Sequence, residues 1–197
     1  PHVDKNDLIL ISAEAVRSLA KWNLMDGIHA VNYDDVGFIS NVVEILVEKK
    51  IADPKAIYAT GHSSGGLFTY RLAKETDLFA AVSPMSCGMA KGAHDPDENT
   101  KSISIIQVIG DIDKSYNGST SERVTMYSAK ERIEIWRTFN RTHPEPVVEV
   151  IGEEIVVDTY ANADGLEVAL VKVKDQGHII RRDLRDTADS IAIDFLL

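Results

Sequence analysis

A serine between glycines, in the order Gly61-His62-Ser63-Ser64-Gly65, is the segment whose residue types and spacing point most directly to chemistry. It lies between a run expected to form a strand and a stretch expected to form a helix, which is the context that a nucleophilic serine of this motif requires. At such a turn the backbone is strained, and residues two before and two after the serine crowd together, so small side chains are expected there. The backbone N–H of Ser64 begins the helix and is expected to donate to a developing oxyanion.

A nucleophilic serine needs a general base, and in this kind of fold the base is a histidine that follows the acid in the sequence. Three histidines follow Ser63. His94 lies too early in a polar loop, and His143 lies before a proline, where a polar cap is the simpler interpretation. His178 follows a strand expected to end at Val173, in a loop at a strand's carboxyl end, where α/β folds place functional groups. His178 is therefore the predicted base.

The acid is expected just after the strong apolar run Ile103–Ile109, where two aspartates, Asp111 and Asp113, follow Gly110. Both stand at the carboxyl end of a strand. Aspartate also starts turns readily, so either residue has a purely structural interpretation. Spacing alone does not choose between the two.

The same segment imitates a calcium-binding loop. Oxygen-bearing side chains occupy positions 1, 3, 5, 7 and 12 of such a loop, at Asp111, Asp113, Ser115, Asn117 and Glu122. Position 6, which needs glycine, is Tyr116, and the preceding element is an expected strand instead of a helix. We therefore reject a calcium-binding helix-loop-helix, and the sequence predicts no metal and no organic cofactor.

The expected elements alternate between strands and helices, which predicts an α/β fold with a mainly parallel sheet in one domain over residues 1–197. Strands are expected at residues 8–11, 56–60, 80–83, 103–109, 147–159 and 166–173. Helices are expected at residues 34–50, 67–74, 121–140 and from about 183 to the end, and residues 91–101 read as a loop.

Composition excludes several classes of function. The net charge is −10, from 31 acidic and 21 basic residues, which argues against a nucleic-acid partner. The short basic cluster around Arg181 and Arg182 is mixed with aspartates and is interpreted as a solvated helix face. No apolar run approaches the roughly 18 residues of a membrane span. The single cysteine, Cys87, excludes an intramolecular disulfide and is expected to be a small buried residue.

Taken together, these residues resemble the polyhydroxybutyrate depolymerase and feruloyl esterase-like group of α/β-hydrolases, including secreted LpqC-type esterases. The resemblance rests on Trp22-Asn23, the run Asp34-Asp35-Val36-Gly37-Phe38-Ile39, residues 53–66, residues 79–82, residues 110–118 and Gln176-Gly177-His178.

The resemblance implies a three-layer α/β-hydrolase fold and a serine carboxylic ester hydrolase with Ser63 as nucleophile, Asp113 as acid and His178 as base. The Ser64 N–H would be one oxyanion donor. It also implies short-chain, hydroxycinnamoyl or acetyl-polysaccharide, or hydroxyalkanoate esters as substrates, and it favours a secreted or periplasmic protein.

Two departures from the family pattern matter. Ile179-Ile180 follow the histidine where the family has Trp-Pro, so an aromatic wall of the substrate site is expected to be missing. The family's first three strands and its His-Gly oxyanion loop have no counterpart before Leu8, so the second oxyanion donor is unaccounted for. Because the third strand normally lies between the fourth and fifth, its loss predicts a gap in the sheet.

Three explanations of that gap stay open. The chain is the C-terminal part of a longer domain, a companion segment or a second copy completes the sheet, or Leu8–Ile11 takes the vacant place. The missing oxyanion loop also keeps a rival hypothesis open, in which the chain is a non-catalytic hydrolase-fold module that binds carbohydrate or a partner. A peptidase or thioesterase with the same three residues is a further alternative.

Overall fold

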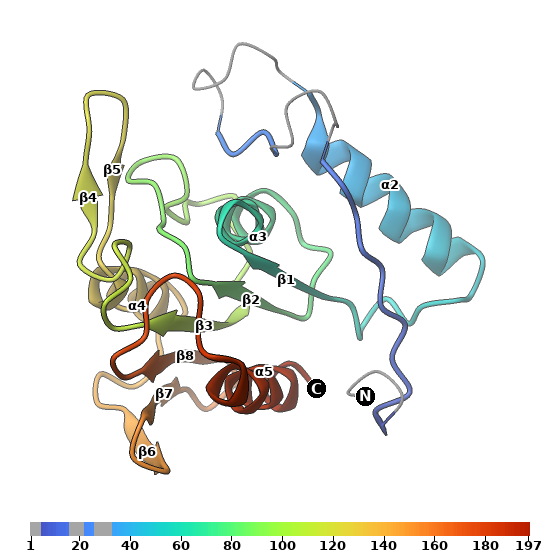
Figure 1. Ribbon diagram of the computed structural model, residues 1–197. Helices are drawn as coiled ribbons and strands as arrows, with labels where there is room; N and C mark the ends of the chain where they lie inside the picture. Colours follow the sequence, from blue (N-terminus) through green and yellow to red (C-terminus); the bar gives the residue numbers. More distant parts are fainter. Residues whose placement is uncertain (1–4, 16–21, 26–32) are drawn as a thin grey trace.

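The strands of this chain build one mixed sheet, in the computed structural model that describes residues 5–15, 22–25 and 33–197 (Figure 1). Its order is β1-β2-β3-β8-β7-β6. The bounds are β1 (Tyr58–His62), β2 (Ala81–Met85), β3 (Ser104–Gly110), β6 (Val147–Ile151), β7 (Ile155–Ala161) and β8 (Glu167–Val173). Strands β1, β2, β3 and β8 pair in parallel, whereas β6, β7 and β8 pair antiparallel. The prediction of a mainly parallel sheet is confirmed, and it brings the carboxyl ends of four strands to one edge.

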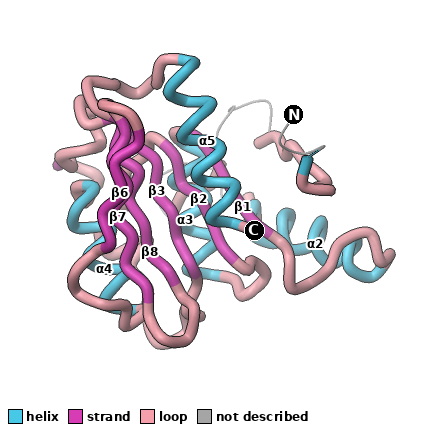
Figure 2. The backbone as a smooth tube through the Cα atoms, turned by 90° about the horizontal axis from the view of Figure 1, so that it is seen from below, coloured by secondary structure: helices cyan, strands magenta, loops and turns pink. Residues whose placement is uncertain are grey.

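Helices cover both faces of the sheet. The helices on these faces are α3 (Ser64–Glu75), α4 (Ala129–Phe139) and α5 (Arg182–Leu196), and a further helix, α2 (Asp35–Glu48), contacts α3. Figure 2 shows α5 on one face and α3 and α4 on the other. Buried side chains of α3 and α4, such as Tyr70 and Trp136, share one core cluster with the sheet, and Leu184 and Ala188 of α5 share the second. None of the helices in the described ranges is both long and apolar enough to span a membrane.

The helix expected over residues 121–140 begins later than predicted. Residues before it form a small antiparallel hairpin of β4 (Ser119–Thr120) and β5 (Thr125–Met126), and α4 starts after Ser128. The Ser128 hydroxyl accepts a hydrogen bond from the Glu131 N–H, and the Glu131 carboxylate accepts one from the Ser128 N–H. This reciprocal capping fixes the start of the helix.

The strand expected over residues 147–159 is wrong in detail. Gly152, at a positive φ of 64°, lies in a turn that divides the segment into β6 and β7. Strand β6 pairs only with β7 in the described sheet, and its valines Val147, Val148 and Val150 are 77, 56 and 64% exposed. The sheet therefore ends on this side in an exposed apolar strand.

On the opposite side the sheet ends at β1, and the strand predicted at Leu8–Ile11 is not formed. Ile9, Leu10 and Ile11 are 62, 72 and 47% exposed and pair with no strand of the described sheet. An apolar run becomes a strand only when a neighbouring strand supplies hydrogen bonds. The apolar composition of Leu8–Ile11 was therefore not enough to predict a strand. The gap expected inside the sheet is likewise not seen in the described ranges, because β1 is an edge strand. The apolar composition of residues 56–60 also predicts a buried strand, and this prediction is wrong, since Thr60 and His62 are exposed.

Candidate active site

The turn from β1 into α3 places Ser63 in a backbone conformation that few residues adopt. Its φ is 57° and its ψ is −117°, and it stands immediately before the helix that begins at Ser64. The Ser63 N–H donates to the Met85 carbonyl at 3.0 Å, which ties the turn to the end of β2. Strain of this kind is held in place by its surroundings and concentrates at functional sites. The Ser64 N–H is among the first amides of α3, which have no acceptor inside the helix.

The glycines around Ser63 that have no room for a Cβ are only in part those that were predicted. A Cβ on Gly61 would lie 2.4 Å from backbone atoms of Gly65, so glycine is required at position 61. A Cβ on Gly65 itself would meet nothing within 4 Å, so the expected crowding at that position is wrong. The other crowded position is Gly66, where a Cβ would lie 2.7 Å from the Cys87 Sγ. The turn thus needs its glycine before the serine and a second one three residues after it.

The structure brings Ser63, His178 and Asp113 together at the carboxyl edge of the parallel strands. The Ser63 Oγ lies 3.0 Å from the His178 Nε2, and the His178 Nδ1 lies 2.8 Å from the Asp113 Oδ2. Because a carboxylate only accepts, His178 donates from Nδ1 and its Nε2 is free to accept the serine proton. The Asp113 side chain is 1% exposed and the His178 side chain is 46% exposed. The imidazole therefore meets solvent while the carboxylate is held inside.

Burial and hydrogen bonding have opposite effects on the pKa of Asp113. Burial by itself would raise the pKa of the carboxyl, but the Ser115 N–H, which donates to Oδ1 at 2.7 Å, and the contact with His178 outweigh it. The pKa of Asp113 consequently lies below its ordinary value. Asp113 is thus ionised at neutral pH and can stabilise a positive charge on His178.

The loops that carry Asp113 and His178 are joined to each other. The Ile112 N–H donates to the Gln176 carbonyl at 3.1 Å, and the Asp175 N–H donates to the Asp111 Oδ1 at 2.7 Å. A Cβ on Gly110 would lie 2.0 Å from the Gln176 carbonyl oxygen, so only glycine allows the loops to approach this closely. Asp111 thus binds the loop, and Asp113 binds the imidazole.

The remaining histidines have other surroundings. His94 is fully buried, with its Nε2 2.8 Å from the Leu24 carbonyl and its Nδ1 accepting from the Ala90 N–H at 3.2 Å. Burial lowers the pKa of His94 to about 4, against the increase due to the Leu24 bond. His143 does not cap the preceding helix, because its Nδ1 accepts from the Glu145 N–H instead. His62 was not predicted to contribute, yet its Nε2 lies 3.1 Å from the His178 carbonyl.

Neither a metal cluster nor a reactive cysteine accompanies Ser63 among the described residues. No cluster of three or more metal-binding side chains occurs within the described ranges. Cys87 is buried, as predicted, and burial raises the pKa of its thiol to about 12, so it is not a competing nucleophile.

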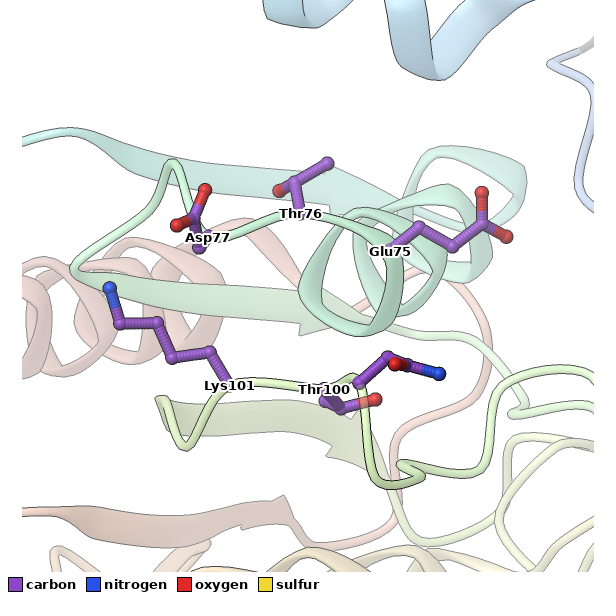
Figure 3. A pocket seen from close by; sticks show the side chains of 6 residues that line it. Glu75, Thr76, Asp77, Thr100 and Lys101 are labelled. Atoms are coloured by element: carbon purple, nitrogen blue, oxygen red, sulfur yellow. The ribbon is translucent and has the colours of Figure 1, made fainter.

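A polar hollow of about 310 Å³ lies at the far end of α3 (Figure 3). Twelve helical residues span about 18 Å, so this hollow is remote from Ser63. It is lined by Glu75, Thr76, Asp77, Asn99, Thr100 and Lys101.

Comparison with known proteins places this chain in a family. The model of the prolyl oligopeptidase family matches residues 28–133, which is more than half of the chain and includes the turn at Ser63. The chain belongs to the prolyl oligopeptidase family. A curated relative, feruloyl esterase B of Piromyces equi, is 30% identical over 168 residues, which make up 80% of this chain and 31% of that protein. This member of the prolyl oligopeptidase family therefore spans about a third of that relative's length, and its resemblance to feruloyl esterases is confirmed.

Solved structures agree on the fold of this prolyl oligopeptidase family member. An acetyl xylan esterase from Aspergillus awamori matches with a TM-score of 0.55 at 18% identity, over 82% of this chain and 67% of that one. The esterase PE8 matches with a TM-score of 0.52 at 12% identity, over 81% of this chain and 59% of that one. The predicted α/β-hydrolase fold is confirmed.

Proposed function

We propose that this chain is a serine carboxylic ester hydrolase that works through an acyl-enzyme. The observation that carries the proposal is the pair of contacts on one imidazole, 3.0 Å from Nε2 to the Ser63 Oγ and 2.8 Å from Nδ1 to the Asp113 Oδ2. The similarity to feruloyl esterase B supports ester substrates. A hydroxyl within reach of an imidazole that is oriented by a buried carboxylate is the arrangement that activates serine for acyl transfer.

In the first half of the reaction, the His178 Nε2 takes the proton of the Ser63 hydroxyl while the oxygen attacks the ester carbonyl. Asp113 holds the imidazole in the tautomer with the proton on Nδ1 and stabilises the imidazolium that forms. His178 then gives the proton to the leaving alcohol, and the acyl group stays on Ser63. In the second half His178 activates a water in the same way, and the acid is released.

Charge on the carbonyl oxygen develops beside the start of α3. The Ser64 N–H is one donor to it, aided by the positive end of the helix macrodipole. Each such donor is worth about two to three powers of ten in rate, so a single donor still supports measurable turnover.

Two exposed isoleucines suggest the kind of acyl group that is accepted. Ile112 precedes the acid and is 66% exposed, and Ile179 follows the base and is 70% exposed. Apolar surface beside reacting groups favours an apolar acyl group over a charged one. We therefore expect short-chain acyl or hydroxycinnamoyl esters, including those linked to polysaccharide, to be substrates.

Turnover of p-nitrophenyl acetate by the wild type and by Ser63→Ala tests the proposal. The expected result is turnover that Ser63→Ala abolishes and that the matched control Ser190→Ala, on the solvent side of α5, keeps. An organophosphate probe should add its phosphoryl mass to the wild type but not to Ser63→Ala. Turnover that survives Ser63→Ala would show that Ser63 is not the nucleophile, and no turnover in the wild type would instead favour a non-catalytic binding module.

A peptidase is the second candidate, because the matching family is named for oligopeptide hydrolysis. The same three residues perform both reactions, and only the leaving group differs. Comparing p-nitrophenyl esters with peptide p-nitroanilides separates the two. A higher kcat/KM for the anilide than for the ester would show that the activity is that of a peptidase and not of an esterase.

A further inference from the structure

A buried cation lies under the turn that carries Asp113. Arg132, the fourth residue of α4, has no exposed surface. Its Nε donates to the Gln107 Oε1 at 3.0 Å, and its Nη1 donates to the carbonyls of Ser115 and Tyr127 at 3.0 and 2.7 Å. Among the described residues, no ion pair includes this guanidinium. Burying a cation without a carboxylate partner is costly, so stability alone is a poor reason for its presence.

The bonds of Arg132 lead to Asp113 through one residue. The carbonyl of Ser115 accepts from Arg132, while the N–H of the same residue donates to the Asp113 Oδ1 at 2.7 Å. The turn is also closed by the Tyr116 N–H, which donates to the Asp113 carbonyl at 2.9 Å. The guanidinium therefore holds the backbone of Ser115 from its carbonyl side, and the N–H of the same residue donates to the carboxylate that contacts His178.

The start of α4 docks on the same turn. The Ala129 N–H donates to the Tyr116 carbonyl at 2.8 Å, and the Tyr127 carbonyl just before the helix accepts from Arg132. The Arg132 Nη2 and the Tyr70 hydroxyl are both buried without a hydrogen-bond partner among the described residues. The orientation of the guanidinium is thus set by the turn and by Gln107, while one of its own donors is left unsatisfied.

From these contacts we propose that Arg132 is a positioning residue for the acid of the catalytic triad, acting through the backbone of Ser115. This inference rests on the proposed function, because it concerns the same hydrolytic site. A misplacement of about 1 Å at a catalytic group costs on the order of 10²-fold in rate. Loss of the guanidinium should therefore lower kcat while leaving the binding of substrate unchanged.

The first test is Arg132→Met, which keeps an unbranched apolar stem in place of the aliphatic part of the side chain and removes its donors. The matched control is Ile133→Ala, which opens a cavity at the next residue of α4, whose side chain packs in the core instead of on the turn. Turnover of p-nitrophenyl acetate is expressed per folded protein, with the folded fraction taken from near-ultraviolet circular dichroism. We expect Arg132→Met to lower kcat about 10- to 100-fold with KM changed less than about twofold, and Ile133→Ala to keep kcat.

A double-mutant cycle separates positioning from a general structural effect. If Arg132 acts through Asp113, Arg132→Met should reduce kcat in the wild type but cause little further loss in Asp113→Asn. Equal factors in both backgrounds would overturn the proposal, and so would a kcat for Arg132→Met within twofold of the wild type. If Arg132→Met does not fold, Arg132→Lys serves in its place, because its ammonium reaches one of the two carbonyls and should give a smaller loss of the same kind.

Wild-type turnover and its loss in Ser63→Ala are measured first. If the wild type shows no Ser63-dependent turnover, the proposed function and the role of Arg132 both fall. If that turnover is present and the cycle gives equal factors, only the role of Arg132 falls.

Discussion

The Oδ1 of Asp111 accepts a hydrogen bond from the backbone N–H of Asp175 at 2.7 Å, across 64 positions of sequence. Asp111 belongs to the loop after β3 and Asp175 to the loop after β8. The bond holds the second loop where His178, three residues farther on, reaches Asp113. Two aspartates that spacing alone could not tell apart therefore have different contacts, one between loops and one with the imidazole.

Exchanging each aspartate for asparagine should separate these contacts. Asp113→Asn is expected to lower kcat by about 10⁴-fold, because the amide favours the wrong imidazole tautomer. Asp111→Asn keeps an oxygen that can accept from the Asp175 N–H, so its kcat should change only a few-fold. Steady-state kinetics on p-nitrophenyl acetate measures both. Losses of equal size would show that Asp113 is not the acid.

Replacing Gly61 and Gly65 by alanine should change the free energy of unfolding in opposite directions. In Gly61→Ala the new Cβ would lie 2.4 Å from the Gly65 backbone, so the free energy of unfolding should fall by about 1–3 kcal/mol. Gly65→Ala meets open space inside a helix and should raise that free energy by up to about 1 kcal/mol. Equilibrium unfolding in urea measures both values. A larger loss for Gly65→Ala than for Gly61→Ala would contradict the geometry described for the turn.

The buried His94 predicts a stability that depends on pH. Burial lowers the pKa of His94 from 6.5 to about 4, so between these values the unfolded chain binds a proton that the folded chain does not. The free energy of unfolding should therefore fall as the pH drops from about 6.5 to 4, by an amount on the order of 3 kcal/mol from this residue.

Because other groups titrate in the same range, the contribution of His94 is measured against His94→Gln. The glutamine oxygen and nitrogen can replace the bonds to the Ala90 N–H and the Leu24 carbonyl. The difference in unfolding free energy between the two proteins should shift in favour of the variant as the pH falls. A difference that stays constant from pH 7 to pH 4 would show that the His94 pKa is not lowered.

The capping of α4 predicts a modest effect on stability. Ser128→Ala removes the hydroxyl that accepts from the Glu131 N–H, and such losses cost about 1 kcal/mol. Ser128→Asp keeps an acceptor and should restore most of the wild-type value. Urea unfolding measures both, and an unchanged free energy for Ser128→Ala would place the start of the helix elsewhere.

Local sequence patterns correctly predicted the helices and strands whose apolar pattern matches the burial that they have in the fold. Apolar residues spaced by three and four predicted α2, and its start follows Asp34, whose side chain accepts from the Gly37 N–H. The apolar run at residues 103–109 became β3, because it is central in the sheet and its side chains are buried on both faces. The turn at Ser63 followed from its motif and from the elements on either side of it.

Other features depend on partners that are distant in sequence. Leu8–Ile11 carries the same signal as β3 but finds no strand to pair with among the described residues. The helix was predicted to begin at residue 121 because Val124 and Tyr127 extend the apolar pattern of α4 backwards, but the Ser128–Glu131 capping pair fixes its start after Ser128. No pattern in the sequence singled out Arg132, because its role follows only from the carbonyls that surround it.

The exposed edge at β6 has a consequence for handling the protein. Val147, Val148 and Val150 line a strand whose outer backbone groups lack a partner in the described sheet, and Glu149 is the charge that interrupts them. Strands of this kind add to copies of themselves when chains meet at high concentration, and a flanking charge only slows the process. Heating should therefore end in irreversible precipitation that begins at this hairpin, and a lysine in place of Val148 should delay its onset.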